Sequence, residues 1–219
     1  MQLEILYQDE AIIVLNKPRG IPVHAGSGGG ETLEDHFHQL QFDAKTPPQL
    51  AHRLDRDTSG CLILGRNKQA LRNLGRLFEQ GRIHKIYWAL VKGVPQAKQG
   101  RINLPLAKQT QDKRRWHMKV DDTGQQAITD YQLLGAANEM SWLALRPKTG
   151  RTHQLRVHCA AMGWPIIGDR FYGGAGEGDP PLMLHARALT IPFYPGQQPL
   201  IVEAPAPEDM ESLCALLTQ

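Results

Sequence analysis

The sequence has 219 residues, 41% of them hydrophobic, and a formal net charge of +3. This length suits one large core and excludes several independent domains, so we expect residues 1–219 to form a single domain. No apolar run approaches the roughly 20 residues that a membrane-spanning helix needs. The first residues include an acid and no basic stretch, and the 3 cysteines are widely spaced. These features favour a cytoplasmic protein with reduced thiols over a secreted or membrane protein.

The positive charge is concentrated in the middle of the chain. Residues 61–120 hold 14 Lys and Arg and only 2 Asp and Glu, including the run Lys113-Arg114-Arg115. Clustered cations attract a polyanion and release its counterions, which makes this third of the chain a candidate phosphate-binding surface. A solvated charged face explains the composition equally well.

The first predicted elements are two strands, at residues 3–7 and 12–15, followed by a turn at residues 16–20. Pro18 and Gly20 make a helix unfavourable in that turn. We therefore expect the second strand to end before residue 16.

Two helices are predicted next, a short one at residues 32–40 and a longer one at residues 67–80. In the longer helix Asn67 is a suitable N-cap and Gly81 a suitable terminator. Its apolar stripe at helical spacing comprises Ala70, Leu71, Leu74, Leu77 and Phe78. This stripe is expected to be core, with Arg72, Arg76 and Arg82 on or near the other face.

The second half of the chain predicts a strand at residues 86–91 and a hairpin with strands at 127–134 and 141–145 around a turn at 135–138. A further helix is expected from about Thr152. Its predicted apolar face comprises Leu155, His158, Cys159 and Met162. Strands and helices alternate without a regular βαβ rhythm, so we predict an α+β fold with a mainly antiparallel or mixed sheet.

A dense group of ionisable residues marks a candidate site at residues 52–60, where His52-Arg53-Leu54-Asp55-Arg56-Asp57 precedes Thr58-Ser59-Gly60. Such density in a loop that enters a strand suggests function. For residues 57–60 we expect instead a surface turn, whose side chains bond to nearby backbone groups. Asp55 is the candidate functional carboxylate.

Two residues elsewhere are candidate partners for this carboxylate. Arg156 is expected to project from a different face of its helix than the apolar residues do. Tyr87 is expected within a strand, on the opposite face from Ile86 and Trp88. For Tyr87 alone, a core or interface role is the better interpretation of the pattern.

The motifs H-R-L-D-x-x-T-S-G at residues 52–60 and G-R-x-H-Q-L-R-x-H at residues 150–158 resemble those of RluA-type RNA pseudouridine synthases. Further segments occur in the order seen in that family, namely Asn16-Lys17-Pro18, Lys85-Ile86-Tyr87, Pro165-Ile166-Ile167-Gly168-Asp169 and Leu184-His185-Ala186. The resemblance covers roughly residues 3–205. It implies a bisected, mixed, mainly antiparallel sheet with flanking helices and a central RNA-binding cleft.

The resemblance also implies roles for particular residues. Asp55 corresponds to the catalytic aspartate, Tyr87 to a tyrosine beside the target base, and Arg156 to a basic partner of the aspartate. Arg53 resembles the arginine associated with eversion of the target nucleotide. Pairing with Arg156 favours the charged form of Asp55.

The implied reaction breaks the bond from ribose C1′ to uracil N1 and joins C1′ to C5, with no oxidation and no group donated. We therefore expect no cofactor and no metal. Because eversion of a base costs a few kcal/mol and is easiest in unpaired regions, we expect a loop or bulge of ribosomal or transfer RNA as substrate. We expect the chain to act as a monomer.

The chain departs from the family pattern in two places. The match begins almost at Met1, without the S4-type RNA-binding module that many members carry. In the segment at residues 123–129, where members often have lysine after a glycine, this chain has Gln125. The first departure bears on which RNA is bound, and the second on one phosphate contact.

Two other functions remain open from the residues alone. Asp55-x-Asp57 resembles the paired aspartates of haloacid-dehalogenase-type phosphatases, although those follow a buried apolar strand and residues 49–54 are polar and charged. The basic middle third also suits an RNA-binding protein without activity. Retention of Asp55, Tyr87 and Arg156 together argues against that interpretation, because binding alone requires no such trio.

Overall fold

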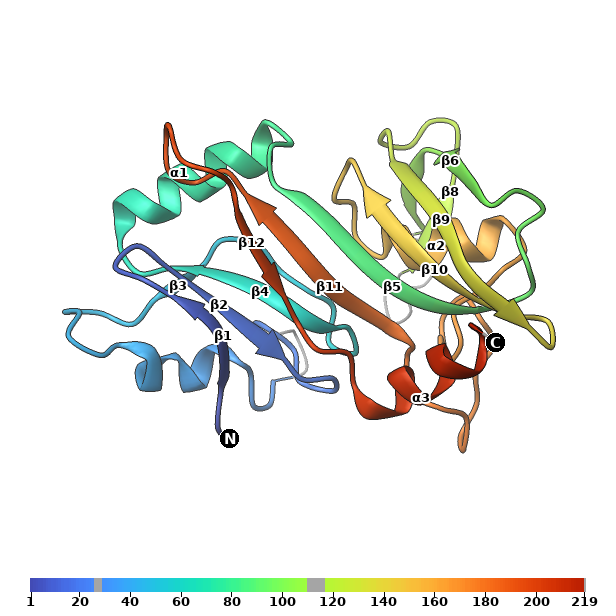
Figure 1. Ribbon diagram of the computed structural model, residues 1–219, viewed down its shortest axis with the longest axis horizontal. Coiled ribbons are helices and arrows are strands. Elements are labelled where there is room, and N and C mark those ends of the chain that lie inside the picture. Colours follow the sequence, from blue (N-terminus) through green and yellow to red (C-terminus); the bar gives the residue numbers. More distant parts are fainter. Residues whose placement is uncertain (26–28, 110–116, 219) are drawn as a thin grey trace. The chain divides into compact units, whose positions relative to one another are not determined.

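The structure is a computed structural model that describes residues 1–25, 29–109 and 117–218 (Figure 1). The predicted basic run Lys113-Arg114-Arg115 lies outside the described residues. By its internal contacts the chain divides into two compact units. Unit 1 comprises Met1–Lys85 and His185–Ala206, and unit 2 comprises Ile86–Leu184 and Pro207–Gln219. The single domain expected from the sequence stays a prediction.

Unit 1 is built on strands β1 (Glu4–Gln8), β2 (Ile12–Lys17), β3 (Gln49–Leu50), β4 (Ser59–Gly65), β11 (Leu184–Ile191) and β12 (Leu200–Glu203). They are ordered β1-β2-β4-β11, with β12 paired to β11 and β3 to β4. The pairing of β4 with β11 is parallel, whereas β1–β2, β2–β4, β3–β4 and β11–β12 are antiparallel.

The two predicted N-terminal strands are confirmed, but the second is longer than expected. β2 continues through Lys17, because Asn16 and Lys17 still pair with Cys61 and Gly60 of β4. The turn predicted from residue 16 therefore begins two residues later. The ladder with β4 outweighs the local turn preference of the sequence.

Helix α1 (Lys68–Glu79) confirms the predicted long helix and covers one face of this sheet (Figure 1). The side chain of Asn67 accepts a hydrogen bond from the Ala70 backbone N–H, as an N-cap does. Leu74 and Leu77 pack in one cluster with residues of β2, β4, β11 and β12. The neighbouring residues of β2 and β4, such as Ile13 and Leu62, point to the other face and are also buried.

The short helix predicted at residues 32–40 is a 3-10 helix, η1 (Glu34–Leu40). Its buried residues Phe37 and Leu40 are three apart, which suits a helix with three residues per turn. Asp35 accepts hydrogen bonds from the backbone N–H and hydroxyl of Thr32 and so fixes the entry to the helix.

Unit 2 contains strands β5 (His84–Lys92), β6 (Gln99–Asn103), β7 (Leu106–Gln109), β8 (His117–Val120), β9 (Ile128–Ala137) and β10 (Met140–Pro147). Their order is β5-β10-β9-β6, all antiparallel, and β7 pairs with β8 in a separate antiparallel ribbon. The first two residues of β5 belong to unit 1.

The predicted β9–β10 hairpin is confirmed, but its predicted turn at residues 135–138 is wrong. The turn consists of Asn138 and Glu139, both with positive φ (50° and 58°), the signature of a tight two-residue hairpin. Gly135 lies inside β9, where a β-carbon would clash with the backbone oxygen of Leu217. The glycine is needed for a close backbone approach and not for the turn.

Helices α2 (Gln154–Ala161) and α3 (Glu208–Leu216) complete unit 2. Val157 of α2 packs with Leu106, Met118 and Ala127 in a small core. The prediction that Met162 belongs to the apolar face is wrong, because Met162 follows the last turn of α2 and is 41% exposed. The predicted α+β class with a mixed, mainly antiparallel sheet is confirmed.

Among the described residues, no helix is long and apolar enough to cross a membrane. All three cysteines are free thiols and buried.

Candidate active site

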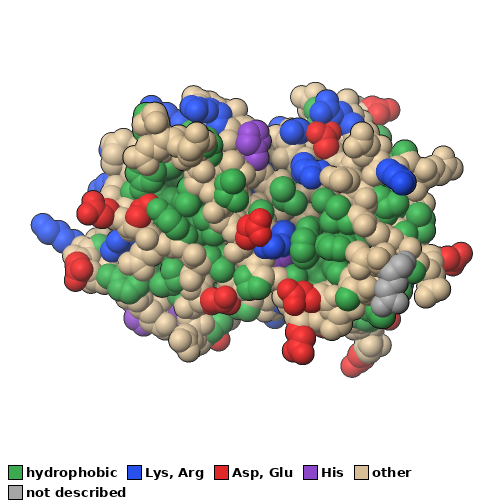
Figure 2. Space-filling model, in the orientation of Figure 1, with side chains coloured by type: hydrophobic (Ala, Val, Ile, Leu, Met, Phe, Trp, Pro, Cys, Tyr) green, Lys and Arg blue, Asp and Glu red, His purple; other side chains and the backbone are tan. Residues whose placement is uncertain are grey.

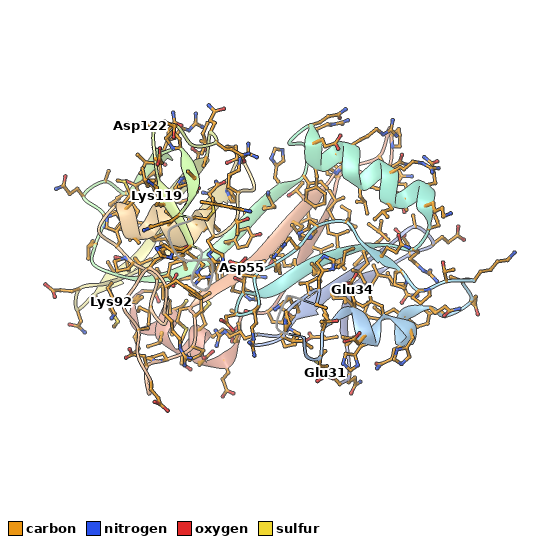
Figure 3. All side chains as sticks on the ribbon, turned by 180° about the vertical axis from the view of Figure 1, so that it is seen from behind. Glu31, Glu34, Asp55, Lys92, Lys119 and Asp122 are labelled. Carbon is orange, nitrogen blue, oxygen red and sulfur yellow. The ribbon has the colours of Figure 1, made fainter. Side chains whose placement is uncertain are left out.

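Asp55 lies in the segment that leads into β4 (Figure 3). Leu54 is buried and anchors this segment, whereas Asp55 is half-buried and Arg53 is exposed. The backbone oxygen of Asp55 accepts a hydrogen bond from the Thr58 N–H at 3.2 Å, which closes a tight turn after the carboxylate. The side chain of Asp55 therefore extends from a backbone that is locally constrained.

Lys17 holds this segment from the end of β2. Its side chain is fully buried, and its Nζ donates to the backbone oxygens of Pro18, Arg56 and Thr58 at 2.8–2.9 Å. Three acceptors match the three protons of an ammonium group. Burial lowers the pKa of Lys17 to about 8, and the negative charges of Asp57 and Asp55 oppose this shift. The sequence indicated Lys17 only as part of a motif and assigned it no role.

The surface turn expected at residues 57–60 is wrong for three of its four residues. Asp57 is exposed, but Thr58, Ser59 and Gly60 are buried. Ser59 bonds to His185, which is 126 residues away in the sequence, and not to a neighbouring backbone group. Gly60 has a φ of +104°, and a β-carbon there would clash with the backbone oxygen of Ala186. This turn is therefore part of the unit 1 core.

His185 is a buried, neutral member of this arrangement. Desolvation lowers its pKa to about 4, with the charges of Arg187 and Arg19 adding to the shift. Because the Ala204 oxygen can only accept a bond, Nε2 of His185 donates to it at 3.2 Å. Nδ1 then accepts a bond from the Ser59 hydroxyl at 2.9 Å. The histidine thus ties β11 to the start of β4.

Arg156 lies in α2 and forms a buried ion pair with Asp169 in unit 2. Its Nε and Nη2 donate to the two carboxylate oxygens, each at 2.8 Å. Asp169 also accepts bonds from the backbone N–H groups of Phe171 and Tyr172. Burial by itself raises the pKa of Asp169, but Arg156 and these N–H groups more than offset this, and the pKa is lowered.

The sequence analysis gave Asp169 no role. Asp169 is part of the segment at residues 165–169, which belongs to the family pattern, but no local sequence signal links it to Arg156. Arg156 is buried, as is every residue of α2 from Gln154 to Cys159. The arginine is oriented by a carboxylate that the fold brings to it.

Gln154 fixes the loop that precedes Arg156. Its side-chain oxygen accepts bonds from the Thr149 hydroxyl and the Arg151 N–H, and its nitrogen donates to Ile128 and Thr129. All four donors and acceptors of this buried amide are therefore used. Gln154 and the Thr149 hydroxyl, which accepts a bond from the Ile128 N–H, thus attach the loop at residues 149–153 to β9.

Tyr87 is half-buried in β5, where it pairs with Leu145 of β10. Its neighbour Trp88 makes an edge-on contact with Trp142, with ring centroids 4.7 Å apart. Because side chains alternate along a strand, Tyr87 points to the opposite face of the sheet from this pair.

An open hollow of about 380 Å³ lies beside the β7–β8 ribbon in unit 2. Its lining includes Lys108, Gly124, Gln125, Gly150, Arg151 and Thr152. The fold thus brings the segment that carries Gln125 together with the Gly150-Arg151 motif. Lys108 and Arg151 give the hollow a cationic lining that suits phosphate groups.

Other basic residues of the middle third lie on the outer side of α1. Arg72, Arg76 and Arg82 are exposed as predicted. Figure 2 shows Lys and Arg side chains at the edge of the molecule where α1 lies. Arg72 and Arg76 bond within the helix, to Gln69 and Asn73, so their position is explained by α1 alone.

The family model "RNA pseudouridylate synthase" matches residues 11–161, a range that includes Arg53, Asp55, Tyr87 and Arg156. An uncharacterized RNA pseudouridine synthase of Zymomonas mobilis is 43% identical over 211 residues, covering 95% of this chain and 96% of that protein. The ribosomal large subunit pseudouridine synthase D of Xylella fastidiosa is 36% identical over 234 residues, covering 99% and 70%.

Two solved human structures are similar in fold. RNA pseudouridylate synthase domain containing 1 aligns with a TM-score of 0.80 at 30% identity, covering 97% of this chain and 87% of that one. RNA pseudouridylate synthase domain containing 4 aligns with a TM-score of 0.79 at 28% identity, covering 97% and 91%.

Proposed function

The chain belongs to the RNA pseudouridylate synthase family, and from this we propose that it isomerises uridine in RNA with Asp55 as the catalytic residue. The observation that carries the proposal is the continuous family match over residues 11–161, which spans Asp55 and the other three candidate site residues. The relatives' names place them in one enzyme class. This argues against both the phosphatase and the inactive RNA-binding protein.

Asp55 can serve as a nucleophile at C6 of the ring or at C1′ of the sugar, or as a base that removes a sugar proton. All three routes need an ionised carboxylate with a defined direction. The constrained segment around Asp55 supports such a role, because Lys17 and the Thr58 N–H hold the backbone on its C-terminal side. Preorganisation of this kind lowers the cost of reaching the reactive geometry.

The other three residues are proposed to bind substrate. Tyr87 stacks on the everted uracil, and its hydroxyl assists the closing proton transfer at C5. Arg53 is exposed beside Asp55 in the sequence and assists eversion of the nucleotide. Arg156 contributes a positive charge to substrate binding, and its guanidinium is already oriented by Asp169.

For the substrate we propose a loop or bulge of ribosomal or transfer RNA. Eversion costs the least free energy for an unpaired base, and a protein can form hydrogen bonds to the exposed edges of such a base. The large-subunit synthases among the relatives support ribosomal RNA as the first substrate to test. We propose that the protein acts in the cytoplasm as a monomer and without a cofactor.

The decisive experiment compares Asp55→Asn with Asp57→Asn. Both changes remove one carboxylate from the same segment, but Asp57 is exposed and has no proposed role in the isomerisation. Pseudouridine would be mapped in RNA from cells that lack the gene, after incubation with each purified protein. We expect product with the wild type and Asp57→Asn, and none with Asp55→Asn. Product formation by Asp55→Asn at the wild-type rate would refute the assignment.

The role of Tyr87 has its own test. Tyr87→Phe keeps the ring for stacking and removes only the hydroxyl, so RNA affinity should persist while the single-turnover rate falls. An unchanged single-turnover rate would show that the hydroxyl takes no part in proton transfer. A phosphatase would instead require both Asp55 and Asp57. Full activity of Asp57→Asn in the preceding experiment would therefore argue against a phosphatase.

A further inference from the structure

Phe171 is an unusually exposed aromatic residue, with 59% of its surface accessible. It lies two residues after Asp169, next to Tyr172 and close to His153 at the start of α2. The ring centroids of Phe171 and His153 are 5.8 Å apart, and those of Phe171 and Tyr172 are 6.3 Å apart. We call Phe171, His153 and Tyr172 the aromatic shelf.

The shelf rests on the buried ion pair. The guanidinium carbon of Arg156 lies 5.2 Å from the centroid of the Phe171 ring and 5.3 Å from that of Tyr172. The Phe171 backbone N–H donates to Asp169 at 2.9 Å. A cation below an aromatic face is attracted by the electrons of the ring. Phe171 is therefore held in place from beneath, although its outer surface is open to solvent.

The backbone at His153 is unusual for a residue other than glycine. Its φ is +53°, in the left-handed region, which is uncommon outside glycine and asparagine. Its Nδ1 lies 2.8 Å from the Tyr172 hydroxyl, whose oxygen also accepts a bond from the Met118 N–H. Such conformations persist only where the surroundings enforce them. Here the enforced conformation places the imidazole beside Phe171.

The surroundings of the shelf are cationic and suit a nucleic acid. Arg151 and Arg170, which flank His153 and Phe171 in the sequence, are both exposed. Thr152 and Met118 line the hollow that also contains Lys108 and Arg151. An exposed aromatic ring beside cations matches the two parts of a single-stranded nucleotide, its base and its phosphate. A neutral apolar partner would gain nothing from the arginines.

We propose that the aromatic shelf stacks an unpaired base of the substrate RNA, with Phe171 as the main stacking surface. This inference rests on the proposed function, and it adds a binding subsite distinct from Tyr87. The neighbouring hollow takes the phosphate that follows the stacked base. A second point of attachment explains how the enzyme holds RNA while the target nucleotide leaves its stack.

The chain offers a matched control in Phe42 of unit 1. Phe42 is also exposed, at 50%, and its ring also lies near a cation, with the Arg66 guanidinium carbon 5.7 Å from the centroid. Within the described part of the chain, the Phe42 ring contacts no second aromatic side chain. Phe42→Ala therefore removes an equally exposed ring without disturbing a shelf.

The test measures binding of a single-stranded octamer of uridine that carries one 2-aminopurine, whose fluorescence is quenched by stacking. We expect Phe171→Ala to weaken binding by about 5- to 150-fold, the usual range for loss of one stacked base, and to abolish the quenching. Phe171→Trp should bind like the wild type. Phe171→Leu should bind like Phe171→Ala, because leucine is apolar but has no ring. Phe42→Ala should bind like the wild type.

Wild-type affinity and quenching in Phe171→Leu would overturn the proposal and leave Phe171 as an ordinary exposed side chain. Equal losses in Phe171→Ala and Phe42→Ala would also overturn it. The assay does not depend on turnover, so the two proposals fail separately. If the shelf binds the probe and the enzyme forms no pseudouridine, the proposed function is wrong. If pseudouridine forms and Phe171→Leu binds normally, the shelf is wrong.

Discussion

The segment around Asp55 in unit 1 and the segment around Arg156 in unit 2 both bury a cation, but they compensate its charge differently. Lys17 donates to three neutral backbone oxygens, whereas Arg156 donates to the carboxylate of Asp169. Neutral dipoles only partly replace water, so the pKa of Lys17 falls to about 8. An arginine keeps its charge at every accessible pH.

This difference shows what each cation is suited for. Lys17 reaches backbone atoms on both sides of a turn and can fix a loop, because an ammonium group donates in three directions. The planar guanidinium of Arg156 matches one carboxylate in two parallel bonds, which orients the arginine itself. Unit 1 therefore fixes a backbone, and unit 2 fixes a side chain.

The largest expected effect comes from breaking the pair in unit 2. Asp169→Asn removes the charge that compensates a buried guanidinium, and should lower the free energy of unfolding by about 3–5 kcal/mol. Asp130→Asn is the matched control, because its partner Arg101 is 60% exposed, and should cost less than about 1 kcal/mol. All four tryptophans fall within the sequence of unit 2. Urea unfolding followed by tryptophan fluorescence therefore reports on this unit, and equal effects of the two variants would contradict the prediction.

Acid should weaken unit 1 through His185. The unfolded histidine takes up a proton near pH 6.5, whereas the folded one does so only at a pKa of about 4. Between these values the unfolded state binds more protons, so stability falls as the pH falls, by up to about 3 kcal/mol. Hydrogen exchange of the β4 amides at pH 7 and pH 4.5 measures this loss. His185→Gln keeps a donor and an acceptor without titrating, and should remove the share of the dependence that His185 contributes. The share of His52, whose pKa burial lowers to about 3, should remain. An equally steep loss of stability in that variant would show that other groups, and not His185, cause the loss.

Removal of the ammonium group of Lys17 should act mainly on the reaction. Lys17→Met keeps the length of the side chain but frees the oxygens of Pro18, Arg56 and Thr58, so the segment that carries Asp55 becomes less constrained. Small displacements of a catalytic group can cost about 100-fold in rate. We expect a loss of this order in the single-turnover rate with saturating RNA, with binding little changed. A variant with the wild-type rate would show that Asp55 needs no support from β2.

The smallest effect should come from the cations of the hollow. If Lys108 and Arg151 each contact one phosphate of single-stranded RNA, each should contribute about 0.7 to the slope of log affinity against log salt concentration. Lys108→Gln and Arg151→Gln should flatten that slope in steps. Arg101→Gln should leave it unchanged, because Asp130 already compensates the charge of Arg101. Equal slopes in all variants would show that the hollow is an ordinary solvated surface that binds no phosphate.

The sequence by itself determined the elements whose information is local. Asn67 caps α1, and the spacing of Ala70, Leu74 and Leu77 defines the buried side, because both signals lie within one or two turns of the helix. The family motifs are similarly short and contiguous, which is why the amino-acid sequence alone is enough to locate them around Asp55, Tyr87 and Arg156.

Only the tertiary structure decided which residues hold these motifs in place. Lys17 is 41 residues from Thr58, and Ser59 is 126 residues from His185, so no local pattern connects them. The turn at residues 57–60 has a composition typical of the surface, but its last three residues are buried, because β11 pairs beside Ser59 and Gly60. Likewise Asp169 becomes the partner of Arg156 only when the chain after α2 folds back on it. Long-range pairing of this kind depends on the complete fold, since a buried polar group accepts whichever partner the packing brings within hydrogen-bonding distance.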